Sequence, residues 1–148
     1  MALVELESPA VSQTLPRSPA APSLVYDLVT TVDHKKIGLM YIALALMFLV
    51  IGGCEALAMR WQLLFPRYDF IGPDAFNQLF TMHGTTMVFF MGMPILIGIG
   101  NYMVPLSIGA RDMAFPRLNA FGFWATLLGG LLVYFSYATG GAPAIGWF

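Results

Sequence analysis

The fold is decided by the stretch between Phe76 and Leu106, which reads FNQLFTMHGTTMVFFMGMPILIGIGNYMVPL. It contains no Asp, Glu, Lys or Arg, and it exceeds the roughly 20 apolar residues that a helix needs to cross a bilayer. Two further stretches reach a similar length, about Ile37–Met59 and about Leu118–Tyr137. Hydrocarbon offers the backbone no hydrogen-bonding partner, so each of these segments must be helical. The sequence therefore predicts an all-α membrane protein with three transmembrane helices.

Composition points to the same class of protein. Hydrophobic residues make up 58% of the 148 residues and charged residues only 10%, which differs from the usual composition of soluble domains. The formal net charge is −1 and Lys and Arg form no cluster, so we expect no nucleic-acid partner. The single cysteine, Cys54, lies inside a span, which excludes a disulfide framework within the chain.

The chain divides into a tail and a membrane domain. Residues 1–23 lack hydrophobic periodicity and contain four prolines among small and polar residues, so they are predicted to be a flexible tail. Residues 24–148 form the predicted membrane domain. Short loops that carry Lys and Arg usually face the cytoplasm. Because Arg17, Lys35, Lys36, Arg111 and Arg117 lie on one side of the spans, and only Arg60 and Arg67 on the other, the N-terminus is predicted to be cytoplasmic.

His83 is the only histidine within the three predicted spans. An ionisable side chain at this depth is costly, and its presence usually marks function. Neutral imidazole is a common metal ligand and an axial ligand of haem iron. From the residue alone, a cofactor ligand and a histidine satisfied within the protein core both remain open.

Glu55 and Arg60 are the other notable polar residues near the membrane. A carboxylate such as Glu55 must be protonated, paired or in contact with a wet cavity. Pairing with Arg60 is not favoured, because five residues is a poor helical offset for an ion pair. Glu55 could instead reach lipid headgroups or serve proton and water traffic. Arg60 considered alone could be a snorkelling residue at the interface.

Glycines recur in the second and third stretches. Small residues let helix backbones approach each other closely in lipid. They would also make room beside a helix for a flat macrocycle. The sequence leaves both uses open for Gly84, Gly92, Gly98, Gly100, Gly122, Gly129 and Gly130.

Four ordered strings of residues resemble a known family. They are VTTVDHKKIGLMY at 29–41, MHGTTMVFFMGMP at 82–94, GNYMVPL at 100–106 and IGARDMAFPRLN at 108–119. Together they resemble subunit I of the haem–copper oxidases, in its bacterial branch, over residues 24–148. The resemblance covers the first three helices of a bundle of roughly twelve, so it identifies an N-terminal portion of that subunit.

The resemblance implies a haem site. His83 would be an axial ligand of the low-spin haem iron, and Arg60 would donate a hydrogen bond to the formyl group of haem A. One departure concerns the outer metal site of the family, because Gln62 stands where the family has a glutamate ligand. The high-spin haem and the copper ligands belong to later helices of subunit I.

The resemblance also implies a proton path. Asp112 matches the aspartate at the mouth of a proton-conducting channel, and Asn101 and Asn119 match the asparagines just inside it. Tyr41 matches another residue that lines the channel near the cytoplasmic end of the first helix. A rim carboxylate can gather protons, and neutral amides can hold water without trapping charge.

The implied function is that of a terminal oxidase in the bacterial inner membrane. Such an enzyme reduces oxygen to water with electrons from cytochrome c and pumps protons, and its subunit I works with subunits II and III, in contact with membrane lipid. This chain alone would not reduce oxygen. Two alternatives remain: a quinol oxidase subunit I, and a small non-enzymatic haem-binding membrane subunit. The second would explain His83 but not the Asp112 loop beside the two asparagines.

Overall fold

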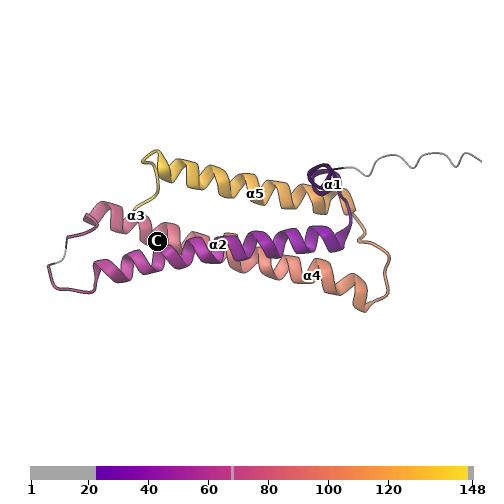
Figure 1. Ribbon diagram of the computed structural model, residues 1–148, viewed down its shortest axis with the longest axis horizontal. Coiled ribbons are helices and arrows are strands. Elements are labelled where there is room, and N and C mark those ends of the chain that lie inside the picture. Colours follow the sequence, from indigo (N-terminus) through magenta and orange to yellow (C-terminus); the bar gives the residue numbers. More distant parts are fainter. Residues whose placement is uncertain (1–22, 68, 147–148) are drawn as a thin grey trace, which may run out of the picture.

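The computed structural model describes residues 23–67 and 69–146, and the fold in this part of the chain is helical. Figure 1 shows the long helices lying lengthwise beside one another, with α2 crossing the α3–α4 span and connections at both ends. The elements in chain order are α1 (Leu24–Thr30), α2 (His34–Gln62), α3 (Pro73–Thr85), the π-helix η1 (Thr86–Gly92), α4 (Met93–Ser107) and α5 (Pro116–Ala138).

The prediction of three transmembrane helices is confirmed. The apolar helices that are long enough to span a membrane are His34–Gln62, Pro73–Ser107 and Pro116–Ala138 in the described residues. Each exceeds its predicted length by a few residues, because polar residues and prolines at the membrane interface start the first turns. Asp33 accepts a hydrogen bond from the Lys35 backbone N–H at the start of α2, and prolines begin α3 and α5.

Helix α1 was not predicted from the sequence. Ser23 caps its first turn, accepting a hydrogen bond from the Tyr26 backbone N–H. The Asp27 carboxylate on α1 pairs with the Lys36 ammonium on α2 at 2.6 Å, which ties the two helices together. The predicted flexible tail lies outside the described residues except for Ser23.

The second span contains a π-helical segment that the sequence analysis also did not anticipate. Pro94 has no backbone N–H, and its ring disfavours a normal helical turn against the carbonyl of Phe90. The Met93 N–H bonds to the Val88 carbonyl, five residues back, as in a π-helix. The segment changes the helical register between His83 and Asn101, so the directions of these two side chains cannot be deduced from one uniform α-helical period.

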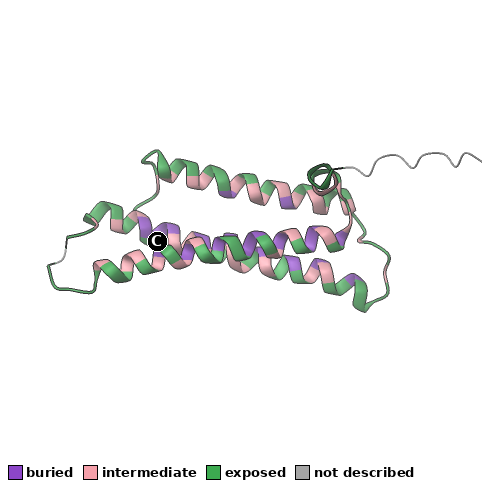
Figure 2. Cartoon of the chain, viewed as in Figure 1, coloured by how far each residue is buried: buried purple, intermediate pink, exposed green. Residues whose placement is uncertain are grey.

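Helix α2 is the centre of the bundle, and most of the buried residues lie along it and along the span it crosses (Figure 2). It meets α4 backbone to backbone at Gly38 and Gly98. A Cβ atom at Gly98 would lie 2.8 Å from the Gly38 carbonyl oxygen, so only glycine fits there. The buried apolar core consists of Ile37, Tyr41, Leu44, Phe48, Phe90 and Phe123.

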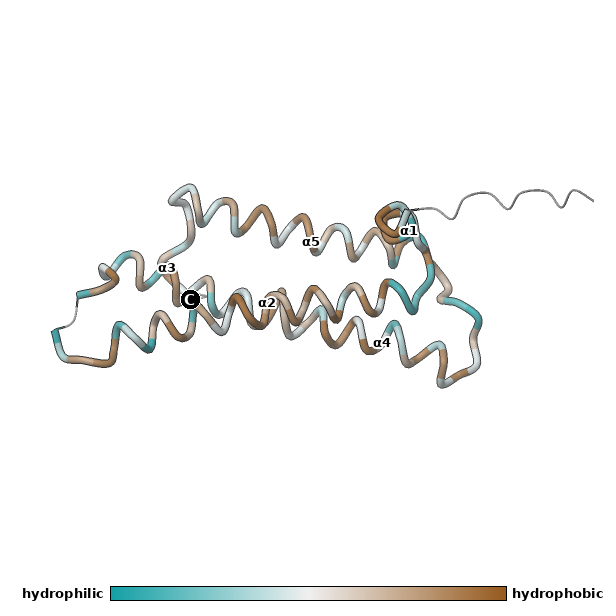
Figure 3. Tube along the Cα trace, viewed as in Figure 1, coloured by the Kyte–Doolittle hydropathy of each residue, from teal (hydrophilic) through white to brown (hydrophobic). Residues whose placement is uncertain are grey.

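The outside of the bundle is strongly apolar. In Figure 3 the helices are mainly brown along their lengths, and teal segments gather at the two ends. Helix α5 packs less extensively than α2 and exposes large apolar side chains that suit lipid or neighbouring helices. These exposed residues include Leu118, Phe121, Leu128, Leu131, Leu132 and Phe135.

Candidate functional site

His83 lies near the end of α3 and is held by the backbone of α2. Its Nδ1 lies 3.0 Å from the Gly52 carbonyl oxygen. A carbonyl oxygen can only accept, so Nδ1 carries the hydrogen and Nε2 keeps a lone pair. A histidine ligand is commonly oriented by such a bond on its other nitrogen. The hydrogen bond therefore leaves the lone pair of Nε2 available for a ligand bond.

Two features of the surroundings bear on what His83 could hold. Clusters of three or more His, Cys, Asp or Glu side chains that could hold an ion are absent from the described part of the chain. A single histidine therefore suits a metal whose other ligands come from elsewhere, as the four nitrogens of a porphyrin do. Gly53, next to the carbonyl that orients His83, has open space where a side chain would stand. The residues present leave room for a haem edge on this side of α2.

The glycine at position 52 brings the two helices together. A Cβ atom there would lie 2.7 Å from the Met87 sulfur and 3.3 Å from the Thr86 methyl group. A larger residue would therefore require the flexible Met87 side chain to move out of this contact. Of the glycines whose use the sequence left open, Gly98 has a packing use, because its backbone meets that of Gly38.

Glu55 pairs with a tyrosine rather than with Arg60. Its side chain is 7% exposed, and its Oε1 accepts a hydrogen bond of 2.9 Å from the Tyr134 hydroxyl of α5. Tyr134 is also hydrogen-bonded to the Thr86 hydroxyl at the start of η1. Of the alternatives for Glu55, the headgroup-facing position is wrong, because this carboxyl group is directed into the bundle.

Arg60 lies in the last turn of α2 and is exposed. It stands eight residues beyond Gly52, which corresponds to about 12 Å along a helix axis. The described contacts join Arg60 to neither His83 nor Glu55, so its role stays a prediction. Gln62 has a local use: its Oε1 accepts hydrogen bonds from the backbone N–H groups of Phe70 and Ile71, which holds the connection to α3.

A second polar group gathers at the other end of the bundle. Asp112, in the connection between α4 and α5, has a side chain that is 40% exposed. Its Oδ1 accepts from the Met113 backbone N–H at 2.8 Å and lies 3.2 Å from Nδ1 of His34. His34 itself is only 2% exposed. The side chain of Asp112 therefore pairs with a buried histidine in the first turn of α2.

The two asparagines meet across the bundle. Nδ2 of Asn101 on α4 donates to Oδ1 of Asn119 on α5 at 2.8 Å. Asn101 is buried, and Nδ2 of Asn119 is a buried donor for which the described residues supply no acceptor. The sequence placed these residues 18 positions apart, and the fold brings them into direct contact.

Tyr41 continues this polar group deeper into the bundle. It is 3% exposed, and its hydroxyl lies against Gly122, one turn beyond Asn119 on α5. The Thr126 side chain, another turn along α5, also interacts with this hydroxyl. We call His34, Asp112, Asn101, Asn119 and Tyr41 the polar column.

The mouth of the polar column opens into a groove. The groove has a volume of about 450 Å³ and is lined by both Asp112 and Asn101, together with apolar residues of α4 and the following connection. The Asp112 carboxylate and the buried Asn101 amide therefore line the same groove, which is large enough for water.

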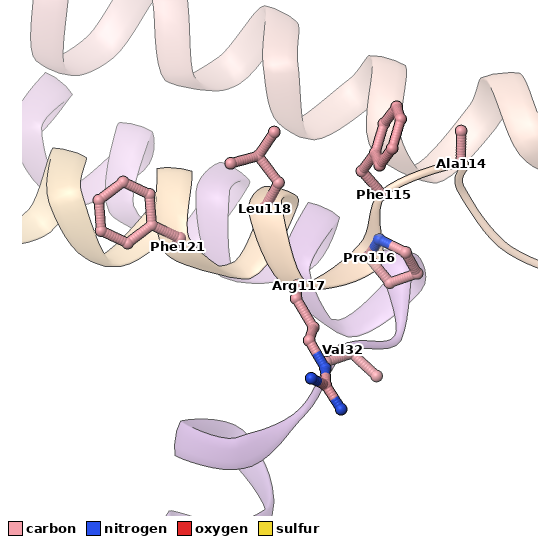
Figure 4. Close-up of a pocket in the computed structure, with 7 residues that line it drawn as sticks. All are labelled: Val32, Ala114, Phe115, Pro116, Arg117, Leu118 and Phe121. Atoms are coloured by element: carbon pink, nitrogen blue, oxygen red, sulfur yellow. The ribbon is translucent and has the colours of Figure 1, made fainter.

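A larger groove lies outside the polar column. It has a volume of about 620 Å³, and its lining includes neither Asp112 nor either asparagine. Its walls are apolar except for Arg117, whose guanidinium group extends away from the phenyl rings in Figure 4. The groove offers no group for proton or metal chemistry. Its lining residues are Val32, Ala114, Phe115, Pro116, Arg117, Leu118 and Phe121.

Sequence reasoning missed two residues of these sites. His34 stands beside Lys35 and Lys36, a setting typical of an exposed position, yet it is buried against Asp112. Its place immediately after the capping residue Asp33 was the available signal, because a first-turn side chain can turn inward. Tyr134 gave no signal, since an aromatic residue in a membrane helix is ordinary.

Comparison with known proteins identifies the chain's relatives. The family described as Cytochrome C and Quinol oxidase polypeptide I matches residues 36–148. The chain belongs to the haem–copper oxidase subunit I family. This confirms the resemblance found in the four sequence strings, and the chain corresponds to an N-terminal portion of subunit I.

Individual members of the family include both kinds of oxidase. Cytochrome c oxidase subunit 1 of Bacillus subtilis (strain 168) is 48% identical over 125 residues, covering 84% of this chain and 20% of that protein. Its counterpart from Bacillus sp. (strain PS3) is 47% identical over 134 residues, covering 90% and 22%. Quinol oxidase subunit 1 of Bacillus subtilis (strain 168) is 50% identical over 119 residues, covering 80% and 18%. The chain thus spans about a fifth of the length of these subunit I relatives.

Proposed function

We propose that this chain forms the N-terminal part of the catalytic subunit of a terminal oxidase. The whole enzyme would reduce oxygen to water with electrons from cytochrome c and pump protons. The observation that carries the proposal is the groove shared by Asp112 and Asn101, because a small haem-carrying subunit has no need of it. That alternative is also disfavoured by membership of the subunit I family.

His83 would hold the low-spin haem A. When bound, the haem supplies one-electron redox chemistry and relays electrons to the oxygen-reducing centre. The protein's part is to aim Nε2 of His83 through the bond between Nδ1 and the Gly52 carbonyl. The second axial ligand, the high-spin haem and the copper ligands would come from other helices of subunit I.

Arg60 would tune this haem through its formyl group. A hydrogen bond from a cation withdraws electron density from the macrocycle and raises its reduction potential. Replacing Arg60 with methionine in the complete oxidase should therefore shift the low-spin absorption band to shorter wavelength and lower the midpoint potential. The measurements are visible spectroscopy and redox titration of the purified complex.

Arg67 provides the matched control, since it is an exposed arginine on the same side of the membrane. Arg67→Met should leave both the band and the potential unchanged. If Arg60→Met behaves like Arg67→Met in an assembled complex, Arg60 only anchors the helix at the membrane interface.

Asp112 would collect protons and pass them along the polar column. The carboxylate is accessible, and His34 holds it at the mouth of the groove. Nδ2 of Asn119 and Nε2 of His34 are buried polar atoms with no protein partner in the described residues. Buried groups of this kind normally bind water, and ordered water can conduct protons. Asn101 and Tyr41 would line the same path.

The membrane setting follows from the same proposal. The polar column would face the cytoplasm of a bacterium, and the chain would cross the inner membrane with its N-terminus inside. Its partners would be the remaining helices of subunit I, subunits II and III, cytochrome c and lipid. The apolar outer face of α5 supports contacts with lipid or with further helices.

The electron donor is tested by assaying the complete oxidase with two reductants. Purified enzyme should consume oxygen at least ten times faster with reduced cytochrome c than with a soluble quinol. The reverse preference would establish the alternative, a quinol oxidase, which the similarity to quinol oxidase subunit 1 of Bacillus subtilis makes the second candidate. If an enzyme that contains its haems consumes oxygen with neither of the two reductants, both candidate functions are contradicted.

A further inference from the structure

His83 belongs to a closed ring of contacts that involves three helices. Its Nδ1 bonds to the Gly52 carbonyl of α2, and three residues along α2 lies Glu55. Glu55 accepts from Tyr134 of α5, which bonds to Thr86, three residues after His83. Three hydrogen bonds and two single helical turns therefore connect His83 back to itself.

The donors in this ring can be assigned from the network. The Tyr134 hydroxyl has one hydrogen and donates it to Oε1 of Glu55. The hydroxyl of Thr86 must then be the donor toward Tyr134. Neighbouring threonines behave differently: Thr81 and Thr85 donate to backbone carbonyls four residues earlier. Thr86, which is fully buried, instead forms its hydrogen bond with Tyr134 of α5.

The packing of α5 brings Tyr134 close to Glu55 and Thr86. One turn earlier, Gly130 lies against the rings of Phe48 and Phe90, and a Cβ atom there would be 3.0 Å from Phe48 Cζ. The ring centroids of Tyr134 and Phe48 are 5.6 Å apart. The glycine lets α5 approach, and the tyrosine then spans the distance to both α2 and η1.

The position of Thr86 matters for the direction of His83. Thr86 is the first residue of η1, where the second span leaves the α-helical register. At such a change the backbone hydrogen bonds shift from a spacing of four residues to one of five. The side-chain hydrogen bond of Thr86, whose methyl group lies beside Gly52, adds a second contact that holds the preceding turn and with it the imidazole.

We propose that Tyr134 is a positioning residue for His83 and, acting through Thr86 and Glu55, sets the orientation of the imidazole toward the low-spin haem. This inference rests on the proposed role of His83 as a haem ligand. Ligand orientation affects the electronic structure of a haem, as other surrounding contacts of the ligand do. Breaking this ring of hydrogen bonds should therefore change the spectrum and the midpoint potential of the haem without removing the haem.

The test uses the complete oxidase with Tyr134→Phe. This substitution removes one hydroxyl group and keeps the aromatic side chain packed on Phe48. We expect unchanged haem content, a shifted electron paramagnetic resonance spectrum of the oxidised low-spin haem, and a shifted midpoint potential. Tyr102→Phe is the control, because Tyr102 lies on α4 beside Gly38, far along α2 from Glu55, and it should match the wild type.

Thr86 provides an independent check on the route. Thr86→Val should shift the spectrum in the same way as Tyr134→Phe, and the double variant should add little, since both changes break one linkage. Thr86→Ser keeps the hydroxyl and should restore the wild-type signature. If the Tyr134 variant does not accumulate, the valine and serine variants at position 86 decide the question.

A wild-type spectrum and potential in both Tyr134→Phe and Thr86→Val would overturn the inference. Fully additive shifts in the double variant would do so too, since the residues would then act separately. Failure of the proposed function looks different. In that case, a variant lacking His83 would keep its low-spin haem, whereas a failure of the ring alone leaves the haem dependent on His83.

Discussion

Replacing His83 with alanine in the complete oxidase should abolish the low-spin haem absorption band and stop oxygen reduction. The reason is chemical: alanine offers the iron no lone pair, and a six-coordinate low-spin iron needs two strong axial ligands. The structure supports this choice of residue, because the bond from Nδ1 to the Gly52 carbonyl leaves Nε2 unprotonated. The measurements are the reduced-minus-oxidised spectrum and oxygen uptake by the purified complex.

His34→Ala is the matched control, since His34 is the only other histidine in the chain. It lies at the opposite end of α2 and should leave the low-spin band in place. Immunodetection of the polypeptide in membranes separates loss of haem from loss of protein. An intact low-spin band in an assembled His83→Ala complex would show that another residue binds the iron.

The sequence predicts the long helices well because hydrocarbon imposes one rule on every residue of a span. A run such as Ile37–Met59 has no alternative to a helix once it is in the membrane. The register within a span is less accessible. Pro94 can be identified in the sequence, but its effect on the helix cannot. Whether a proline causes a kink or a π-helical turn depends on neighbours such as Phe48, which packs against Phe90.

The site residues also differ in how much of their role the sequence can predict. Asn101 and Asn119 were singled out by resemblance, yet their hydrogen bond depends on how α4 and α5 cross. Glu55 was recognised as costly, and only the fold supplied its partner Tyr134, because that residue lies 79 positions away in sequence. Residues that carry unusual chemistry can be found in a sequence, whereas residues that support them are found through their contacts.

Replacing Asp112 with asparagine should slow oxygen consumption at least tenfold and stop proton release on the outer side, while the haem spectrum stays normal. Asparagine has nearly the same shape and can still accept from His34 and from the Met113 N–H, but it cannot take up a proton. A positioned proton-transferring group commonly contributes on the order of a hundredfold or more to a rate. The measurements are oxygen uptake, and acidification outside proteoliposomes that contain the purified enzyme.

The competing explanation treats Asp112 as an exposed loop carboxylate whose ion pair contributes at most about 1 kcal/mol to stability. Asp27→Asn is the control for that explanation, because Asp27 is also a partly exposed carboxylate at this end, paired with Lys36 outside the groove. Both variants would lose a surface pair, but only the Asp112 variant would lose the acid that shares a cavity with Asn101. Equal and near-normal turnover and pumping in the two variants would therefore assign Asp112 a structural role and place proton uptake elsewhere. A defect confined to Asp112→Asn would tie proton supply to the polar column, since the two substitutions remove the same charge and differ in the space that the side chain faces.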